Sequence, residues 1–289
     1  MLKIALRNVF RNRRRSLLSL SLIALGGAIL FLARAYFDET IYQLRWSSAY
    51  QYGHLQIAAA GYWEGSPEGY EHLISKSLLE KIGAILVSEE DVERFTTQLG
   101  LSGLIGTERK STVFVSTGVE PGKEIGGFPL EEGEGLAPGD QDKALIGTGM
   151  AENLGVGVGD YLTVMGTTID GAYNAGALQI KGIFEWWQAE VNNQFTVVPL
   201  VFAQRMLNTD AVEKVLVELK ELEVTERVAE RLGRKFEEEG LRVEVKRWDE
   251  LSVFYRQVRG YYGAIYTFIT TAIFILVFFS ILEVMTMSF

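Results

Sequence analysis

Two long apolar stretches dominate the pattern of hydrophobic and polar positions. Residues 17–33 and 261–282 contain no charged side chain. Helices over these stretches would be about 25 and 33 Å long, and the hydrocarbon core of a bilayer is about 30 Å thick. We therefore predict two transmembrane helices near the two ends of the chain. The first is short, so it can draw on Ser16 and residues 34–37, with the Arg34 side chain reaching toward the lipid headgroups.

Both helices are predicted to continue outside the membrane as stalks. The first spans about residues 17–47. The second is predicted to begin near Trp248, with Asp249 in its N-cap region, and residues 251–289 are assigned to its stalk and transmembrane part. Amphipathic aromatic residues concentrate where a membrane meets water. The aromatic residues that we expect at the outer interface are Tyr36, Phe37, Tyr42, Trp46, Tyr255, Tyr261 and Tyr262.

The residues between the two spans, about 48–250, have the pattern of an α/β domain. Its clearest part is a helix over 225–239 with Val228, Leu232 and Phe236 on one apolar face and Gly240 just past its end. A β-rich run precedes this helix and an alternating run follows it, so we predict a strand–helix–strand unit. The other predicted elements are strands at 53–59 and 112–117 and helices at 73–82 and 89–99, the last with Ser88 as N-cap.

The middle of this domain, about 118–200, is different in composition. It is rich in glycine and in short β runs, at 161–165, 178–184 and 195–199, with one short predicted helix at 148–154. We predict a small mostly-β subdomain inserted here. The predicted fold class is therefore an α/β extracytoplasmic domain with this insertion, held by two transmembrane helices with extended stalks.

Basic residues gather at the N-terminus. Residues 1–37 carry seven basic residues and no acid, although the whole chain has a net charge of −9. A basic block before the first apolar stretch indicates that residues 1–16 are cytoplasmic. Nucleic-acid binding is the rival explanation of RNRRR, but a membrane span follows at once and the rest is acidic, so we expect no nucleic-acid partner. The topology signal consists of Lys3, Arg7, Arg11, Arg13, Arg14 and Arg15.

The same N-terminal layout resembles a cleavable signal peptide, because Ala33-Arg34-Ala35 has the form of an A-x-A site. Three observations favour a permanent anchor. The apolar run is longer than the usual stretch of about 7–15 residues. Arg34 fits poorly inside a cleavage site, and the amphipathic pattern continues without a break beyond it.

No catalytic or metal-binding constellation is found in the sequence. The chain has no cysteine, and its two histidines, His54 and His72, lack metal-ligand spacing; His54 is expected to be structural. Gly122-Lys123 lacks the rest of a phosphate-binding loop, since Glu124 replaces the Ser or Thr that would bind magnesium. The acidic stretch at 131–142 is predicted to be a solvated loop. We therefore expect no cofactor, no metal and no enzymatic activity.

Six sequence stretches follow one another in an order that is typical of one family. They are MLKIALRNVFRNRRRS at the start, YGHLQI at 52–57, GVEP at 118–121, IGTGMAENLGVGVGDYLTV at 146–164, KGIF at 181–184 and VPLVFAQ at 198–204. Together they resemble the FtsX/MacB/LolC–LolE type of ABC-transporter permease, and YGHLQI resembles its lipoprotein-releasing LolC/LolE branch. In GVEP, Glu120 stands where the family usually has Asp.

The resemblance implies a membrane subunit that couples ATP hydrolysis by another subunit to motion of its outer, MacB-like periplasmic core domain. Such permeases have four membrane helices and an ATPase-contacting stretch after the second, so a chain that stops at Phe289 is expected to be a fragment. The implied partners are an ABC ATPase subunit, a second permease copy or paralogue, membrane lipids and a lipoprotein. The implied location is the bacterial cytoplasmic membrane, with the large domain on the extracytoplasmic side.

A lipid-anchored substrate would need an apolar cavity between the outer ends of the two membrane helices. Each candidate for its lining can equally be a lipid-facing or packing residue. The candidates are Ile29, Phe31 and Leu32 on the first helix and Ile265, Phe268 and Ile269 on the second.

Three other functions stay open at this point. A MacB-like efflux permease for drugs or peptides would use the same scaffold. A two-span sensor or chemoreceptor has the same layout of spans and outer domain. An enzyme held outside the membrane is disfavoured by the missing catalytic set.

The basic block predicts that residues 1–16 and Phe289 lie inside and that about 47–250 lie outside. The chain has no native cysteine, so single-cysteine variants can be labelled without background. A membrane-impermeant maleimide added from outside should modify Ser66→Cys and spare Ser16→Cys. The reverse labelling pattern would contradict the predicted topology.

Overall fold

The computed structural model describes residues 13–64 and 70–286. The chain forms two compact units, one made of Met1–Ser47 with Ser252–Phe289 and the other of Ser48–Leu251. We call the first the helix pair and the second the outer unit, and each is described by itself.

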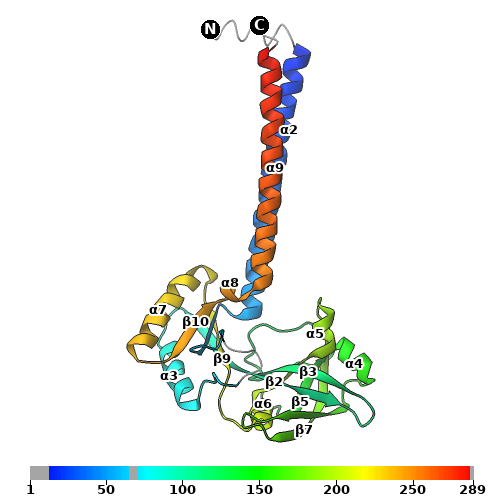
Figure 1. Cartoon of the computed structure of the whole chain (residues 1–289), viewed down its shortest axis with the longest axis vertical. Helices are drawn as coiled ribbons and strands as arrows, with labels where there is room; N and C mark the ends of the chain where they lie inside the picture. Colours follow the sequence, from blue (N-terminus) through cyan, green and yellow to red (C-terminus); the bar gives the residue numbers. More distant parts are fainter. Residues whose placement is uncertain (1–12, 65–69, 287–289) are drawn as a thin grey trace. The chain divides into compact units, whose positions relative to one another are not determined.

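The helix pair consists of α2 (Arg13–Tyr52) and α9 (Val253–Thr286), which confirms two long apolar helices (Figure 1). The predicted start of the second near Trp248 is wrong, because Trp248 opens a separate one-turn helix, α8 (Trp248–Leu251). The chain is interrupted at Ser252, whose hydroxyl accepts a hydrogen bond from the Tyr255 N–H at 3.2 Å. A serine that accepts from the third following N–H is an N-cap, so α9 begins after Ser252.

The outer unit contains a sheet whose strands follow the order β10-β1-β9-β2-β3-β8-β5-β7-β4, with β6 pairing β2 and β7. The strands are β1 (Leu55–Ala59), β2 (Val92–Gly106), β3 (Ser111–Val119), β4 (Leu130–Gly133), β5 (Lys143–Gly147), β6 (Tyr161–Thr167), β7 (Tyr173–Phe184), β8 (Phe195–Pro199), β9 (Lys214–Leu219) and β10 (Val243–Arg247). Besides α8, the helices are α3 (Lys76–Val87), α4 (Thr148–Leu154), α5 (Ala189–Gln194), α6 (Leu200–Leu207), α7 (Thr225–Glu238) and a 3-10 turn at Leu222–Val224.

Pairing of β6 with both β2 and β7 closes a barrel of six strands in the order β2-β3-β8-β5-β7-β6. Its side chains form one hydrophobic core, in which Ile105, Phe114 and Ile146 are at most 2% exposed. The predicted mostly-β segment at 118–200 supplies β4 to β8. The barrel also takes in β2 and most of β3, which precede that segment, because the pairing that closes it joins strands far apart in sequence.

Helices close both ends of this barrel. Since β5 and β8 pair antiparallel, their C-terminal ends lie at opposite ends of the barrel. α4 follows β5 directly and α6 follows β8 directly, and both contribute buried residues to the barrel core. The α6 contact is close, because a Cβ added to Gly118 would lie 2.6 Å from the Cβ of Ala203. The barrel is therefore a filled body and has no channel along its axis.

The rest of the outer unit is an open sheet covered by α3 and α7. Strands β9 and β10 both pair antiparallel with β1, so they run parallel to each other, and α7 connects them. This confirms the predicted strand–helix–strand unit. Val228, Leu232 and Phe236 are at most 1% exposed in a second hydrophobic core, and Gly240 has a positive φ of 65° just past the helix. α3 begins later than predicted, because Ser75 is its N-cap.

The predicted helix at 89–99 is wrong, since residues from Val92 onward form β2. The acidic residues that suggested a helix N-terminus have other partners. Glu89, whose side chain is 5% exposed, pairs with Arg231 and with Lys235 at 2.9 Å. Asp91 also pairs with Arg231, and this hydrogen bond lowers the pKa of the Asp91 carboxyl. These contacts fix α7 against the loop before β2.

His54 is a structural residue, as expected. The residue is 7% exposed, and its Nδ1 accepts a hydrogen bond from the Leu219 N–H at 2.7 Å. Nδ1 can accept only when it carries no proton. Burial lowers the pKa of the imidazole below its ordinary value of 6.5. The folded state therefore favours neutral His54, and this contribution to stability is complete above about pH 6.5 and decreases as the pH falls below it.

Replacing His54 with asparagine should make the stability of the protein less sensitive to acid. The side-chain carbonyl oxygen of the new asparagine can accept the same hydrogen bond, but an amide does not titrate. One proton contributes a slope of at most about 1.4 kcal/mol per pH unit. Melting curves of the full chain and of His54→Asn between pH 7.5 and 5 measure the difference. Two curves that stay parallel over this range would show that His54 is not protonated on unfolding.

Candidate functional site

The two helices of the helix pair meet along a narrow seam. On α2 the less exposed positions recur every three or four residues, and on α9 a matching series recurs at the same spacing. This spacing is that of helices packed side by side. The seam is formed by Gly26, Leu30, Ala33, Phe37 and Leu44 on α2 and by Val258, Tyr262, Ile265, Ile269, Ile273 and Val277 on α9.

The two helices approach each other closely at Gly26. A Cβ added there would lie 3.0 Å from Cγ2 of Ile273, whereas a Cβ added to the neighbouring Gly27 would meet nothing within 4 Å. Small residues allow membrane helices to approach closely, because attraction between helices in lipid depends on van der Waals contact. The two glycines therefore have different roles although they are adjacent.

Aromatic residues cluster at one level of the helix pair. The Phe37 ring lies 5.4 Å from that of Tyr262 and 5.7 Å from that of Tyr266, edge to face in both cases. The Arg34 guanidinium lies 5.6 Å from the centre of the Tyr266 ring and also pairs with Asp38 at 2.7 Å. Such a group of aromatic and charged side chains is typical of a membrane–water interface. It lies just past the apolar stretch of α2.

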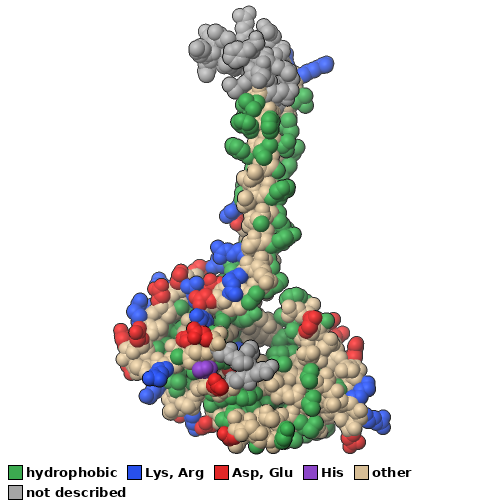
Figure 2. Space-filling view, viewed as in Figure 1, with side chains coloured by type: hydrophobic (Ala, Val, Ile, Leu, Met, Phe, Trp, Pro, Cys, Tyr) green, Lys and Arg blue, Asp and Glu red, His purple; other side chains and the backbone are tan. Residues whose placement is uncertain are grey.

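Hydrophobic side chains cover the outside of the helix pair as well as the seam (Figure 2). Of the six candidate cavity residues, Ile265 and Ile269 lie half-buried in the seam. The other four point away from it, with Phe31 and Phe268 each 74% exposed, Leu32 66% and Ile29 44%. Within this single chain the six residues therefore do not line one cavity, and the cavity stays a prediction for the complete transporter.

Of the basic topology signal, Arg13 and Arg14 are exposed at the beginning of α2. Lys3, Arg7, Arg11 and the side chain of Arg15 lie outside the described residues, as does Ser66. The inside position of the N-terminus stays a prediction.

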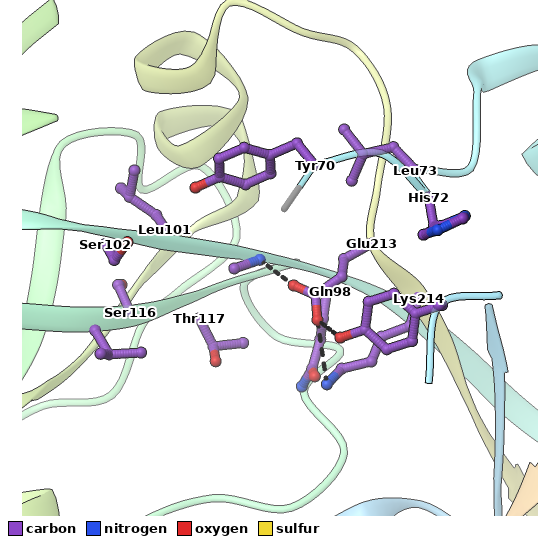
Figure 3. A pocket seen from close by; sticks show the side chains of 13 residues that line it. Tyr70, His72, Leu73, Gln98, Leu101, Ser102, Ser116, Thr117, Glu213 and Lys214 are labelled. Carbon is purple, nitrogen blue, oxygen red and sulfur yellow. Dashed lines mark hydrogen bonds and ion pairs between the residues drawn. The ribbon is translucent and has the colours of Figure 1, made fainter. Parts of the chain in front are cut away.

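The outer unit contains a cleft of about 390 Å³ that the sequence analysis missed (Figure 3). We call it the β2–β3 cleft. It lies beside the part of β2 between its two pairing partners. The pairing of β2 with β9 ends at Gln98, and its pairing with β6 begins at Leu104. The lining residues are Tyr62, Tyr70, His72, Leu73, Gln98, Gly100, Leu101, Ser102, Val115, Ser116, Thr117, Glu213 and Lys214.

Glu213 organises one wall of this cleft. Its carboxylate accepts hydrogen bonds from the Tyr62 hydroxyl and, at 2.6 Å, from the Gly100 N–H. The Lys214 Nζ lies 3.6 Å from the same carboxylate. Tyr70 forms part of the opposite wall, and burial raises the pKa of its hydroxyl, which therefore stays protonated at neutral pH. The sequence offered one signal, the cluster of Tyr62, Trp63 and Tyr70 in a single loop.

The described residues contain no group of three or more His, Cys, Asp or Glu side chains that could hold a metal ion. The cleft has a carboxylate and a histidine, but the carboxylate is already occupied by Tyr62, Gly100 and Lys214. The arrangement is suited to binding and to mechanical support. Fold and surfaces together define a membrane protein whose large mixed α/β domain lies between two candidate spans.

The sequence matches the family described as MacB-like periplasmic core domain over residues 16–235. This match covers more than half of the chain, so the chain belongs to that family. It is an ABC-transporter permease of the MacB/FtsX type, a non-catalytic membrane subunit. The comparison with curated proteins finds no match.

Two solved structures are similar to the outer part of the chain. The periplasmic region of MacB from Actinobacillus actinomycetemcomitans is 12% identical, with a TM-score of 0.52 over 70% of this chain and 92% of that chain. The extracellular domain of the noncanonic ABC-type transporter YknZ from Gram-positive bacteria is 14% identical, with a TM-score of 0.49 over 66% and 98%. The first supports the mixed α/β fold with its six-stranded barrel.

Enlarging Gly26 should separate the two helices, whereas enlarging Gly27 should not. Gly26→Leu must displace Ile273, and overpacking of this kind costs about 1–3 kcal/mol. Gly27→Leu is the matched control, because both changes raise helix propensity by a similar amount. Spin labels at the exposed positions Leu22 and Phe279 report the interhelical distance, and thermal melting in detergent reports stability. Equal effects of the two substitutions would contradict the seam.

Proposed function

We propose that this permease chain releases lipoproteins from the outer leaflet of the bacterial cytoplasmic membrane. It acts in a complex with a separate ABC ATPase subunit and a second permease copy or paralogue. The observation that carries the proposal is the apolar surface that α2 and α9 leave exposed beyond their seam. In lipid this surface can contact both phospholipid tails and the acyl chains of a lipid-anchored substrate.

The orientation of the chain in this proposal rests on its charge pattern. Basic residues before the first span favour a cytoplasmic N-terminus. The outer unit, Ser48–Leu251, then lies on the extracytoplasmic side, and the aromatic group around Phe37 and Tyr262 lies at the outer membrane surface.

In this proposal, force reaches the outer unit through the helix α2. α2 is one helix from Arg13 to Tyr52, so it crosses the border between the two units without a break. Its last residues are fixed inside the outer unit, where Ser48 and Ala49 are buried. A Cβ added to Gly126 would lie 2.9 Å from the Gln51 carbonyl oxygen, so the end of the helix is held by close backbone contact. We expect a movement of α2 caused by the ATPase to be passed to the outer unit through these last residues.

The lipoprotein assignment rests on two features. The sequence YGHLQI at 52–57, most of which forms β1, resembles the lipoprotein-releasing branch. The exposed side chains of Ile29, Phe31, Leu32 and Phe268 add apolar surface to α2 and α9, and an acyl chain that leaves the membrane could contact this surface. Ile265 and Ile269 would add to it if the seam opened during transport.

Efflux of drugs or peptides is the second candidate function, and one observation bears on its route. The barrel core is filled and both barrel ends are closed by helices. A substrate that passed the outer unit would therefore move along its surface or between two copies. The β2–β3 cleft is one recess with polar lining that such a substrate would meet on the outer unit.

Photo-crosslinking in the complete transporter tests the lipoprotein proposal. A photoreactive amino acid at Ile29, Phe31, Leu32 or Phe268 should form adducts with lipoprotein, because these side chains are exposed. The same probe at Leu30, which lies in the seam, is the matched control and should link mainly to α9. Probes at Ile265 and Ile269 should reach lipoprotein only in the state in which the seam is open.

The lipoprotein proposal is contradicted if probes at all six positions link only to phospholipid and if blocking these positions leaves lipoprotein transfer intact. Adducts with an exported drug or peptide at the outer unit would support the efflux function instead.

A further inference from the structure

We infer that the β2–β3 cleft of the outer unit binds an uncharged, hydroxyl-rich ligand of the carbohydrate class. The inference is independent of which substrate the permease transports. Three observations support it. The charges in the cleft compensate each other, several of its polar side chains make no hydrogen bond within the described part of the chain, and only a short stretch of unpaired β2 backbone faces it.

The charges of the cleft compensate each other. Glu213 and Lys214 have opposite charges, with the Lys214 Nζ 3.6 Å from the Glu213 carboxylate. The carboxylate is further held by the Tyr62 hydroxyl and the Gly100 N–H, so it has little remaining capacity for a cation. A strongly charged ligand would lose its hydration without gaining a counter-charge, which is costly. The cleft is therefore better suited to a neutral ligand.

Several polar side chains in the cleft have unused hydrogen-bonding capacity. Tyr70, Gln98, Ser102 and Thr117 line it, and in the described part of the chain none of these four side chains makes a hydrogen bond. Figure 3 shows the Tyr70 side chain extending over the strands that carry Ser102 and Thr117. Hydroxyl and amide groups can both donate and accept. This is also the property of sugar hydroxyls, so the two sets of groups complement each other.

The cleft also offers apolar surface beside these polar groups. Leu73, Val115 and the rings of Tyr62 and Tyr70 line the same space. A sugar ring has C–H faces as well as hydroxyl edges, and aromatic rings with a polar tip can contact both. The cleft volume of about 390 Å³ lies in the range of small-ligand sites, about 300–1,000 Å³.

An extended peptide is the alternative ligand, and the backbone of β2 makes it less suitable. Strand addition needs a run of free N–H and C=O groups along a sheet edge. On β2 the ladder with β9 runs to Gln98 and the ladder with β6 starts at Leu104. Between them the Gly100 N–H is already bonded to Glu213. Too short an edge remains for a strand, so recognition must depend on side chains.

Titration with defined oligosaccharides tests the inference. The full chain is kept in an amphipol, because the headgroup of a maltoside detergent would compete for the cleft. The probes are maltotriose, chitotriose and an uncharged trialanine blocked at both ends, and binding is followed by saturation-transfer NMR. We expect saturable binding of at least one trisaccharide and none of the peptide. Tyr70→Phe and Gln98→Leu should each weaken this binding about three- to tenfold.

Matched variants separate loss of the cleft from loss of folding. Tyr161→Phe removes a hydroxyl from a tyrosine that is 67% exposed and does not line the cleft, so it should leave binding unchanged. Ser102→Ala changes an exposed side chain inside the cleft and should weaken binding without lowering the melting temperature. The inference is overturned if no trisaccharide binds, if the peptide binds instead, or if binding is the same in native protein, Tyr70→Phe, Gln98→Leu and Ser102→Ala.

Discussion

The outer unit depends on one strand that takes part in two hydrophobic cores. The first half of β2 pairs with β9 in the open sheet, and its second half pairs with β3 and β6 in the barrel. Phe95 packs against the open-sheet core, whereas Leu99 and Ile105 are fully buried in the barrel core. Because backbone hydrogen bonds are costly to break inside a protein, a motion of one core relative to the other must bend β2 or break its ladders. We therefore expect the outer unit to move as one body.

A single body of this kind suits the proposed work of a permease. The filled barrel has no channel, so its contribution is mechanical or through its surface. α2 enters the outer unit as an unbroken helix, while the connection to α9 is interrupted at Ser252. The connection through α2 is thus a continuous helix, whereas the connection to α9 contains a break at Ser252, the N-cap of α9. Coupling between ATPase and substrate would bias this assembly between two arrangements. The same strand β2 also forms the cleft, at the point where its partner changes from β9 to β6.

Local elements could be predicted from the sequence where the hydrophobic pattern and the residues that end a helix or strand pointed to the same bounds. β8 and α4 have the expected bounds, and Gly240 ends α7 as expected. The prediction of a helix at 89–99 was wrong because Glu89 and Asp91 form ion pairs with residues of α7. These partners are about 140 residues away in sequence, so no local pattern reveals them. Barrel closure and the cleft depend on similar long-range pairings. The six candidate cavity residues were chosen by their depth in the membrane. The heptad spacing through Gly26, Leu30 and Ala33 would have shown which face of α2 packs against α9 and which faces away from it.

Hydrogen exchange tests most directly whether β2 makes the two cores one body. Leu232 is fully buried in the open-sheet core, and Leu232→Ala should cost about 2–5 kcal/mol. Amide exchange of the native full chain and of this variant can be compared peptide by peptide. If the cores are coupled through β2, protection should fall in β3 and β6 of the barrel as well as in β1 and β9. Loss of protection confined to the open sheet, with the barrel unchanged, would contradict the account.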